Sequence, residues 1–158
     1  SRGLGDVYKR QKMKLSIAAA LSHHAELLVL DEATGGLDPI VRDEILDVFS
    51  DFTLEENHTV LLSSHIVSDL EKICDYIAFL HEGKLLFCEE KDVLVERFVL
   101  VQLSLADLET LPEETIVGVQ KNAFGATVLM ERSAINAGFS VGKPSLEEII
   151  LYMVRGQK

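Results

Sequence analysis

The sequence contains little cysteine, no tryptophan and no long apolar run. Two cysteines, Cys74 and Cys88, are too few for the disulfide framework of a small secreted protein, which favours a reducing compartment. No apolar run reaches the roughly 18 residues that a membrane-spanning helix needs, and the first residues do not resemble a cleavable signal. Hydrophobic residues fill 47% of the 158 positions, enough for one ordinary core. We therefore expect an α/β protein with no membrane span of its own.

Basic residues are outnumbered by acidic ones. The sequence contains 15 lysines and arginines and 26 aspartates and glutamates, so the formal net charge is −11. An acidic surface repels the phosphates of nucleic acids and the headgroups of anionic lipids. We expect no nucleic-acid partner, and we expect any link to a membrane to come through another protein.

Residues 1–11 differ in composition from the rest of the chain. They are polar and lack helical periodicity, whereas a helical pattern begins at Lys12 and continues to His23. These eleven residues also resemble a one-frame translation of a common transposase-type sequencing adapter. Segments of this kind are excluded from reasoning about the fold. Our hypothesis is that the natural fragment begins at Lys12; the alternative is an unusual natural loop.

Helical and strand patterns alternate after Lys12. The apolar runs 27–30 and 59–62 predict buried strands of a parallel sheet. Between them, Asp38 and Pro39 predict a helix start, with Asp38 as N-cap and Pro39 at the first helical position. The expected apolar stripe of this helix is Ile40, Ile45, Leu46, Val48, Phe49 and Phe52. The next expected elements are a helix over 66–74, strands over 76–80 and 84–88, and a hairpin turn at Glu82-Gly83.

This alternation favours a layered α/β domain with a mostly parallel sheet over residues 12–97. Beyond it the pattern changes to short strands and a terminal helix that runs from Ser145 to Val154. Ser145 and Glu148 have the spacing of a capping box. The three expected strands are 99–105, 115–120 and 126–131. We expect residues 98–158 to form a small α+β extension, either an appended subdomain or a continuation of the edge of the sheet.

Two adjacent carboxylates, Asp31 and Glu32, follow the first apolar run. Open α/β folds bind ligands at the C-terminal edge of their parallel strands. In phosphoryl transfer, the first carboxylate suits holding Mg²⁺ through a bound water, because Mg²⁺ dehydrates reluctantly. The second suits orienting or deprotonating the attacking water. On their own, two acidic residues after a strand more often belong to a solvated loop.

The continuation of this stretch is more specific. Residues 27–39 closely resemble the Walker B motif and D-loop of ATP-binding-cassette ATPases. His65 ends the segment Ser63-Ser64-His65, 33 residues after Glu32, where that family has its switch histidine. The resemblance covers residues 27–65 and implies part of a P-loop NTPase domain of the RecA-like type.

The resemblance also implies a role for each of these side chains. Asp31 would hold Mg²⁺, Glu32 would act on the attacking water, and His65 would donate a hydrogen bond to the γ-phosphate of ATP. Asp38 would couple two ATP sites across a dimer of nucleotide-binding domains, a role compatible with a plain helix cap. Gly35 departs from the serine that the family usually has in the D-loop, which puts one hydrogen bond across that dimer in doubt.

The family's phosphate-binding loop has no counterpart in the 158 residues. Gly3-Leu4-Gly5 lacks the spacing of such a loop, and Gly142-Lys143 is followed by Pro144, which has no backbone N–H to offer. In the family the signature serine precedes the Walker B aspartate by about 23 residues, a position that here falls within residues 1–11. We therefore expect a C-terminal fragment that is inactive alone, and we assign no nucleotide contact to residues 1–11.

The C-terminal segment, residues 145–156, is similar to the tail of exporter-type cassette ATPases, although its apolar spacing also fits a core-facing stripe of Leu146, Ile149, Ile150 and Met153. The resemblance implies an ATP-hydrolysing subunit that uses ATP and Mg²⁺. Its expected partners are a second nucleotide-binding domain and a transmembrane permease, and its expected location is the cytoplasmic face of a cell membrane. The alternatives are a cassette ATPase of translation or chromosome maintenance, or a non-catalytic binding module. The sequence does not identify the cargo.

Overall fold

The computed structural model describes residues 2–135 and 139–156. The chain divides into two compact units, Ser1–Ile73 and Cys74–Lys158, which are described separately. The division falls inside the predicted domain 12–97. The predicted domain boundaries, 1–11, 12–97 and 98–158, stay predictions.

The first helix is longer than the sequence pattern indicated. Helix α1 (Arg2–Leu21) begins ten residues before Lys12 and ends before His23, so both predicted ends were wrong. Residues 2–11 contain no proline, and extending an existing helix costs far less than nucleating one. Ser1 lies outside the described residues. The hypothesis that residues 1–11 are an adapter stays a prediction.

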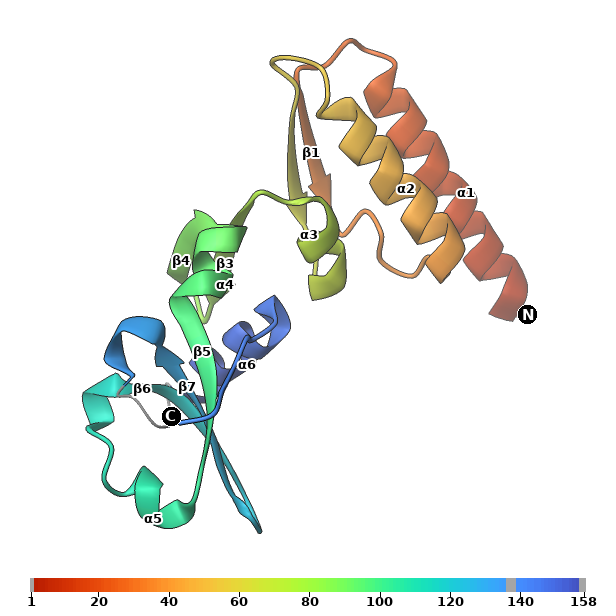
Figure 1. Ribbon diagram of the computed structural model, residues 1–158. Coiled ribbons are helices and arrows are strands. Elements are labelled where there is room, and N and C mark those ends of the chain that lie inside the picture. The colour runs from red at the N-terminus through yellow and green to blue at the C-terminus, as the bar shows by residue number, and fades with distance from the viewer. Residues whose placement is uncertain (1, 136–138, 157–158) are drawn as a thin grey trace. The chain divides into compact units, whose positions relative to one another are not determined.

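A pair of parallel strands and three helices form the described part of the first unit, and the shortest of these helices is α3 (Val67–Ile73). Strand β1 (Leu27–Asp31) pairs with β2 (Thr59–Ser63) in a register that runs from Leu27 opposite Thr59 to Asp31 opposite Ser63. Helices α1 and α2 (Pro39–Phe52) lie side by side on one face of this pair (Figure 1). The buried residues of this layer are Ile17, Ala33, Ile45, Leu46 and Phe49.

Helix α2 begins as predicted. Asp38 is its N-cap, with extended backbone, and its carboxylate accepts a hydrogen bond from the N–H of Val41 at 3.1 Å. The predicted apolar stripe was partly wrong, because Ile40 is 74% exposed and Val48 is 41% exposed. Both lie off the face that packs on the strands.

The two parallel strands are covered on one face only within the described residues. Leu28 is buried, whereas Val29 is 67% exposed and Leu61 is 62% exposed. Side chains alternate between the faces of a strand, so the continuous apolar run places half of its residues away from the helices. The prediction that both runs are fully buried was wrong for this part of the molecule.

The prediction of a mostly parallel sheet is not confirmed. Among the described strands, only β1 and β2 are parallel. Strands β3 (Tyr76–His81) and β4 (Lys84–Glu90) form the predicted hairpin, joined by Glu82 and Gly83. Both turn residues have positive φ, 46° and 76°, as in the two-residue turn that matches strand twist. This turn returns the chain beside itself and makes the pair antiparallel.

The rest of the second unit is an antiparallel sheet with a helix against it. Its strand order is β6-β7-β5-β8, and every neighbouring pair is antiparallel. The strands are β5 (Phe98–Leu103), β6 (Ile116–Asn122), β7 (Gly125–Glu131) and β8 (Val141–Gly142). The helices described in this unit are α4 (Lys91–Arg97), α5 (Leu105–Leu108), η1 (Glu113–Thr115), η2 (Arg132–Ala134) and α6 (Leu146–Gly156).

Helix α6 starts with the predicted capping box. The N–H of Glu148 donates to the Ser145 hydroxyl at 3.2 Å, and the N–H of Ser145 donates to the Glu148 carboxylate at 2.8 Å. Leu146 and Ile149 are fully buried, and Tyr152, which the predicted stripe omitted, is buried with them. None of the described helices is both long and apolar enough to cross a membrane.

Candidate functional site

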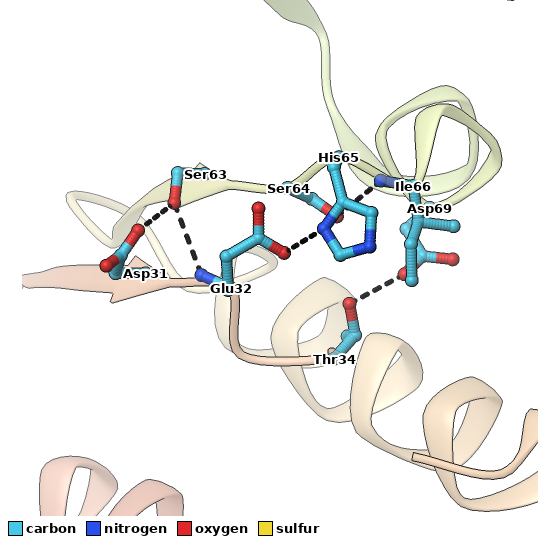
Figure 2. A network of polar contacts seen from close by, with 8 residues as sticks. All are labelled: Asp31, Glu32, Thr34, Ser63, Ser64, His65, Ile66 and Asp69. Carbon is cyan, nitrogen blue, oxygen red and sulfur yellow. Dashed lines mark hydrogen bonds and ion pairs between the residues drawn. The ribbon is translucent and has the colours of Figure 1, made fainter. Parts of the chain in front are cut away.

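The site begins where the two parallel strands end. Asp31 is the last residue of β1, and its register partner Ser63 is the last residue of β2. The Ser63 hydroxyl donates a hydrogen bond to Oδ1 of Asp31 (Figure 2). The next residue, Glu32, donates its N–H both to the Ser63 hydroxyl at 3.2 Å and to the Ser63 carbonyl at 3.0 Å. Strand pairing thus brings the acidic pair and a serine to one edge.

Glu32 has an unusual backbone. Its φ is 49°, in the left-handed region that a non-glycine residue rarely adopts. The turn is closed by the N–H of Gly35, which donates to the Glu32 carbonyl at 2.9 Å. The chain therefore leaves the strand direction at Glu32. Backbone of this kind recurs at functional sites, where the surrounding structure holds it in place.

Glu32 faces His65. Oε2 of its carboxylate lies 2.6 Å from Nδ1 of the His65 ring. The side chains are 43% and 74% exposed, respectively, so both can reach a ligand from solvent. Figure 2 shows the Glu32 carboxylate, on the segment after β1, pointing at the His65 ring, on the segment after β2. The structure brings together the predicted residues Asp31, Glu32 and His65 at one strand edge.

The contact constrains the protons on the His65 ring. A carboxylate only accepts hydrogen bonds, so Nδ1 carries the proton when Glu32 is ionised. A neutral ring with Nδ1 protonated offers only an acceptor at Nε2. The ring donates from Nε2 only when it is doubly protonated.

A second link joins the two segments below the surface. The Thr34 hydroxyl donates to Oδ2 of Asp69, in α3, at 2.7 Å. Thr34 is 0% exposed and Asp69 is 3% exposed. Nε of Arg42 lies 3.5 Å from the other carboxylate oxygen, so the buried charge is paired. This link ties the turn after Glu32 to the helix that follows His65.

The Asp38 side chain caps a helix. Its carboxylate caps α2 through the N–H of Val41, a structural role that the sequence pattern predicted. Gly35, in the same turn, is close to the Glu32 carbonyl, and a Cβ at Gly35 would lie 3.1 Å from that oxygen. A serine at this position would need a small shift of the turn. The role of Asp38 in a dimer stays a prediction.

Asp31 has the chemistry to contact a divalent cation. It is exposed, and among the described residues its second oxygen, Oδ2, makes no hydrogen bond or ion pair. No group of three His, Cys, Asp or Glu side chains in the described parts of the chain could hold a metal ion alone. Mg²⁺ usually keeps several waters and is bound by one or two carboxylates together with substrate phosphates. One exposed carboxylate oxygen is compatible with such binding.

Sequence reasoning assigned no role to Ser63, Thr34 or Asp69. Ser63 could have been found from the expected pairing of the two strands, because Asp31 and Ser63 end the two runs. Thr34 and Asp69 gave no signal, since their meeting depends on the turn at Glu32 and on the position of α3.

Three curated proteins illustrate what the chain is similar to. The bacitracin transport ATP-binding protein BcrA of Bacillus licheniformis is 48% identical over 75 residues, which are 48% of this chain and 24% of that protein. The lantibiotic transport ATP-binding protein SrtF of Streptococcus pyogenes is 40% identical over 98 residues, which are 57% and 42% of the two chains. The methionine import ATP-binding protein MetN 1 of Bacillus cereus is 34% identical over 144 residues, which are 86% and 39%.

The chain is a homologue of the ATP-binding proteins of ATP-binding-cassette (ABC) transporters. No family model matches it. The chain spans about a quarter to two-fifths of the length of these ABC relatives. The match to MetN 1 shows that the similarity extends over most of this chain.

Proposed function

We propose that this chain is part of a subunit that hydrolyses ATP to power an ABC transporter. The observation that carries the proposal is the contact of Glu32 with His65, beside Asp31, at the shared edge of two parallel strands. The homologues are named as ATP-binding proteins of transporters, which supports ATP as the substrate. The chemistry of each side chain follows from its contacts.

Asp31 is the proposed Mg²⁺ residue. Its Oδ1 is occupied by the Ser63 hydroxyl, which leaves Oδ2 for a cation or for a water bound to one. When bound, Mg²⁺ would neutralise charge on the phosphates. A single carboxylate suffices for this purpose if the phosphates and waters supply the other ligands.

Glu32 is the proposed base. One carboxylate oxygen is engaged by His65, and the side chain is 43% exposed, so the other oxygen can accept a hydrogen bond from a water. A carboxylate that holds a water in line with a phosphoryl group orients it and can accept its proton. The carboxylate is directed toward His65 by their contact, from a backbone that turns away from the strand direction at Glu32.

His65 is the proposed donor to the γ-phosphate. The ring uses Nδ1 toward Glu32, so a donated hydrogen bond to the phosphate comes from Nε2 of the doubly protonated ring. A cationic donor suits an oxygen that gains negative charge during the reaction. Glu32 thus serves two functions, as a base toward water and as the counter-ion of His65.

The partners and the direction of transport are also proposals. A second nucleotide-binding domain would contact the D-loop around Asp38, and a transmembrane permease would hold the assembly at the cytoplasmic face of the membrane. Two of the relatives are named for transport of bacitracin and of a lantibiotic, which supports an exporter. Isolation of the protein from membranes together with a polytopic partner tests this part, and recovery without any membrane protein contradicts it.

ATP turnover by the complete reading frame that contains this chain tests the function itself. We expect Mg²⁺-dependent hydrolysis, and a loss of about 10²- to 10³-fold in turnover for His65→Ala, the loss that follows removal of one charge-stabilising donor. His23→Ala is the matched control, because His23 is an exposed histidine of the same unit, beyond the end of α1. A wild-type protein without ATP turnover, or equal turnover in both variants, would contradict the proposal.

A further inference from the structure

Ser63 makes hydrogen bonds to both acidic residues of the candidate site. Its hydroxyl donates to Oδ1 of Asp31 and accepts from the N–H of Glu32. It occupies this position because β2 ends at Ser63, directly opposite Asp31 in the parallel register. One hydroxyl group therefore contacts both residues, from the neighbouring strand (Figure 2).

The two hydrogen bonds differ in how much they depend on the hydroxyl. The N–H of Glu32 also donates to the Ser63 carbonyl, at 3.0 Å, so the backbone at Glu32 keeps a partner if the hydroxyl is removed. The Asp31 carboxylate has no second hydrogen-bond partner among the described residues. It is exposed, and the Ser63 hydroxyl is the group that holds it. Loss of the hydroxyl therefore frees the Asp31 side chain while leaving the Glu32 turn in place.

We propose that Ser63 is a positioning residue that fixes the rotamer of Asp31, so that Oδ2 faces the cation while Oδ1 is held by the strand. This inference rests on the proposed function, because it concerns the Mg²⁺ that Asp31 would bind. Groups that hydrogen-bond a metal ligand restrict its orientation, and their loss commonly weakens metal affinity or activity by about 10- to 100-fold. A serine that merely ended the strand would have no effect specific to the metal.

Thr and Val at position 63 separate the hydroxyl from the shape of the side chain. The two residues are nearly isosteric and both suit a strand, so Ser63→Thr and Ser63→Val differ chiefly in the hydroxyl. Thr59→Val is the control, because it makes the same exchange at the opposite end of the same strand. Thermal unfolding of each variant checks that it is folded as the wild type is. Ser63→Ala replaces Ser63→Val if the valine protein does not fold.

Binding of Mn²⁺, followed by electron paramagnetic resonance in the nucleotide-bound complete protein, is the main readout. We expect Ser63→Val to raise the half-saturating Mn²⁺ concentration by about tenfold, the lower end of the range for a group that supports a metal ligand. Ser63→Thr and Thr59→Val should bind like the wild type. In the metal-free protein, the ¹³C signal of the Asp31 carboxyl group should shift in Ser63→Val and stay in place in Thr59→Val.

The outcomes separate this inference from the proposed function. The role of Ser63 alone would be overturned if Ser63→Val binds Mn²⁺ as tightly as the wild type and leaves the Asp31 signal unshifted, while the wild type hydrolyses ATP normally. A loss of turnover in Ser63→Val without weaker Mn²⁺ binding would also overturn it. Absence of ATP turnover in the wild type would refute the proposed function, and the inference would fall with it.

Discussion

Nδ1 of His65 lies 2.6 Å from Oε2 of Glu32, although the two residues are 33 positions apart in the chain. The contact arises because the parallel strands β1 and β2 end at the same edge, and the acidic residue and the histidine each follow one of them. It places a proton on Nδ1 when Glu32 is ionised, and it makes the carboxylate the counter-ion of the ring when the ring is doubly protonated. The chemistry proposed for the site depends on this pairing.

The proton on His65 is the first prediction. With Glu32 ionised, the neutral ring should carry its proton on Nδ1, because a carboxylate accepts and does not donate. Long-range ¹H–¹⁵N correlation spectra distinguish the two neutral forms. Of the two neutral forms, we expect the Nδ1-protonated one to dominate in the wild type and its share to fall in Glu32→Ala. The same spectrum in both proteins would show that the contact does not set the tautomer.

The buried link between Thr34 and Asp69 leads to a prediction about stability. Thr34→Val keeps the shape of the side chain and removes the donor to a carboxylate that is 3% exposed. An unsatisfied buried group costs about 1–3 kcal/mol, so we expect the free energy of unfolding of this unit to fall by that amount. Hydrogen exchange of the β1 and β2 amides measures the loss in the intact chain.

Thr53→Val is the control for this measurement. Thr53 is exposed and donates its hydroxyl to the Ser50 carbonyl at 2.8 Å, where water can replace the lost donor. We expect a change within about 0.5 kcal/mol, as for most surface substitutions. Equal losses for Thr34→Val and Thr53→Val would mean that the link to Asp69 does not stabilise the turn.

The two cysteines should differ in reactivity. Burial raises the pKa of the Cys74 thiol, the nearby Asp75 raises it further, and the Lys91 charge opposes both. Cys88 is exposed. Because the thiolate is the nucleophile, iodoacetamide should modify Cys88 well before Cys74 at neutral pH, as measured by mass spectrometry of the native protein. Denaturation should abolish the difference; a difference that persists in urea would not come from the fold.

The raised pKa of Cys74 also predicts how the free energy of unfolding changes with pH. The folded state holds the thiol proton more tightly than the unfolded state, so the contribution is fully present below the unfolded pKa. It is lost as pH rises through the folded pKa, because unfolding then allows the thiol to ionise. Cys74→Ser should reduce this alkaline loss of stability, and an unchanged alkaline profile would contradict its origin in Cys74.

The sequence predicted those features that depend on residues close together in the chain. Asp38 and Pro39 identified the start of α2, Ser145 and Glu148 the cap of α6, and Glu82-Gly83 the hairpin turn. Each is a local arrangement in which one or two side chains determine the backbone. Local patterns of this kind can be recognised without knowing which elements pack together.

Features that depend on distant segments were predicted less well. The apolar runs 27–30 and 59–62 predicted the parallel pair, but they did not show whether both of its faces are covered. The mostly parallel sheet was not confirmed, because the other described strands pair in antiparallel fashion. The links of Ser63 to Asp31 and of Thr34 to Asp69 join residues 32 and 35 positions apart. They depend on strand register and on the positive φ of Glu32, which periodicity does not encode.

The most direct test of the proposed site is ATP turnover by Glu32→Gln in the complete reading frame that contains this chain. The amide keeps the size of the side chain but cannot accept a proton from water as a carboxylate does. We expect ATP-dependent dimerisation to persist while turnover falls by about 10²- to 10⁴-fold, the usual contribution of a general base. Wild-type turnover in Glu32→Gln would contradict the assignment of Glu32 as the residue that activates water.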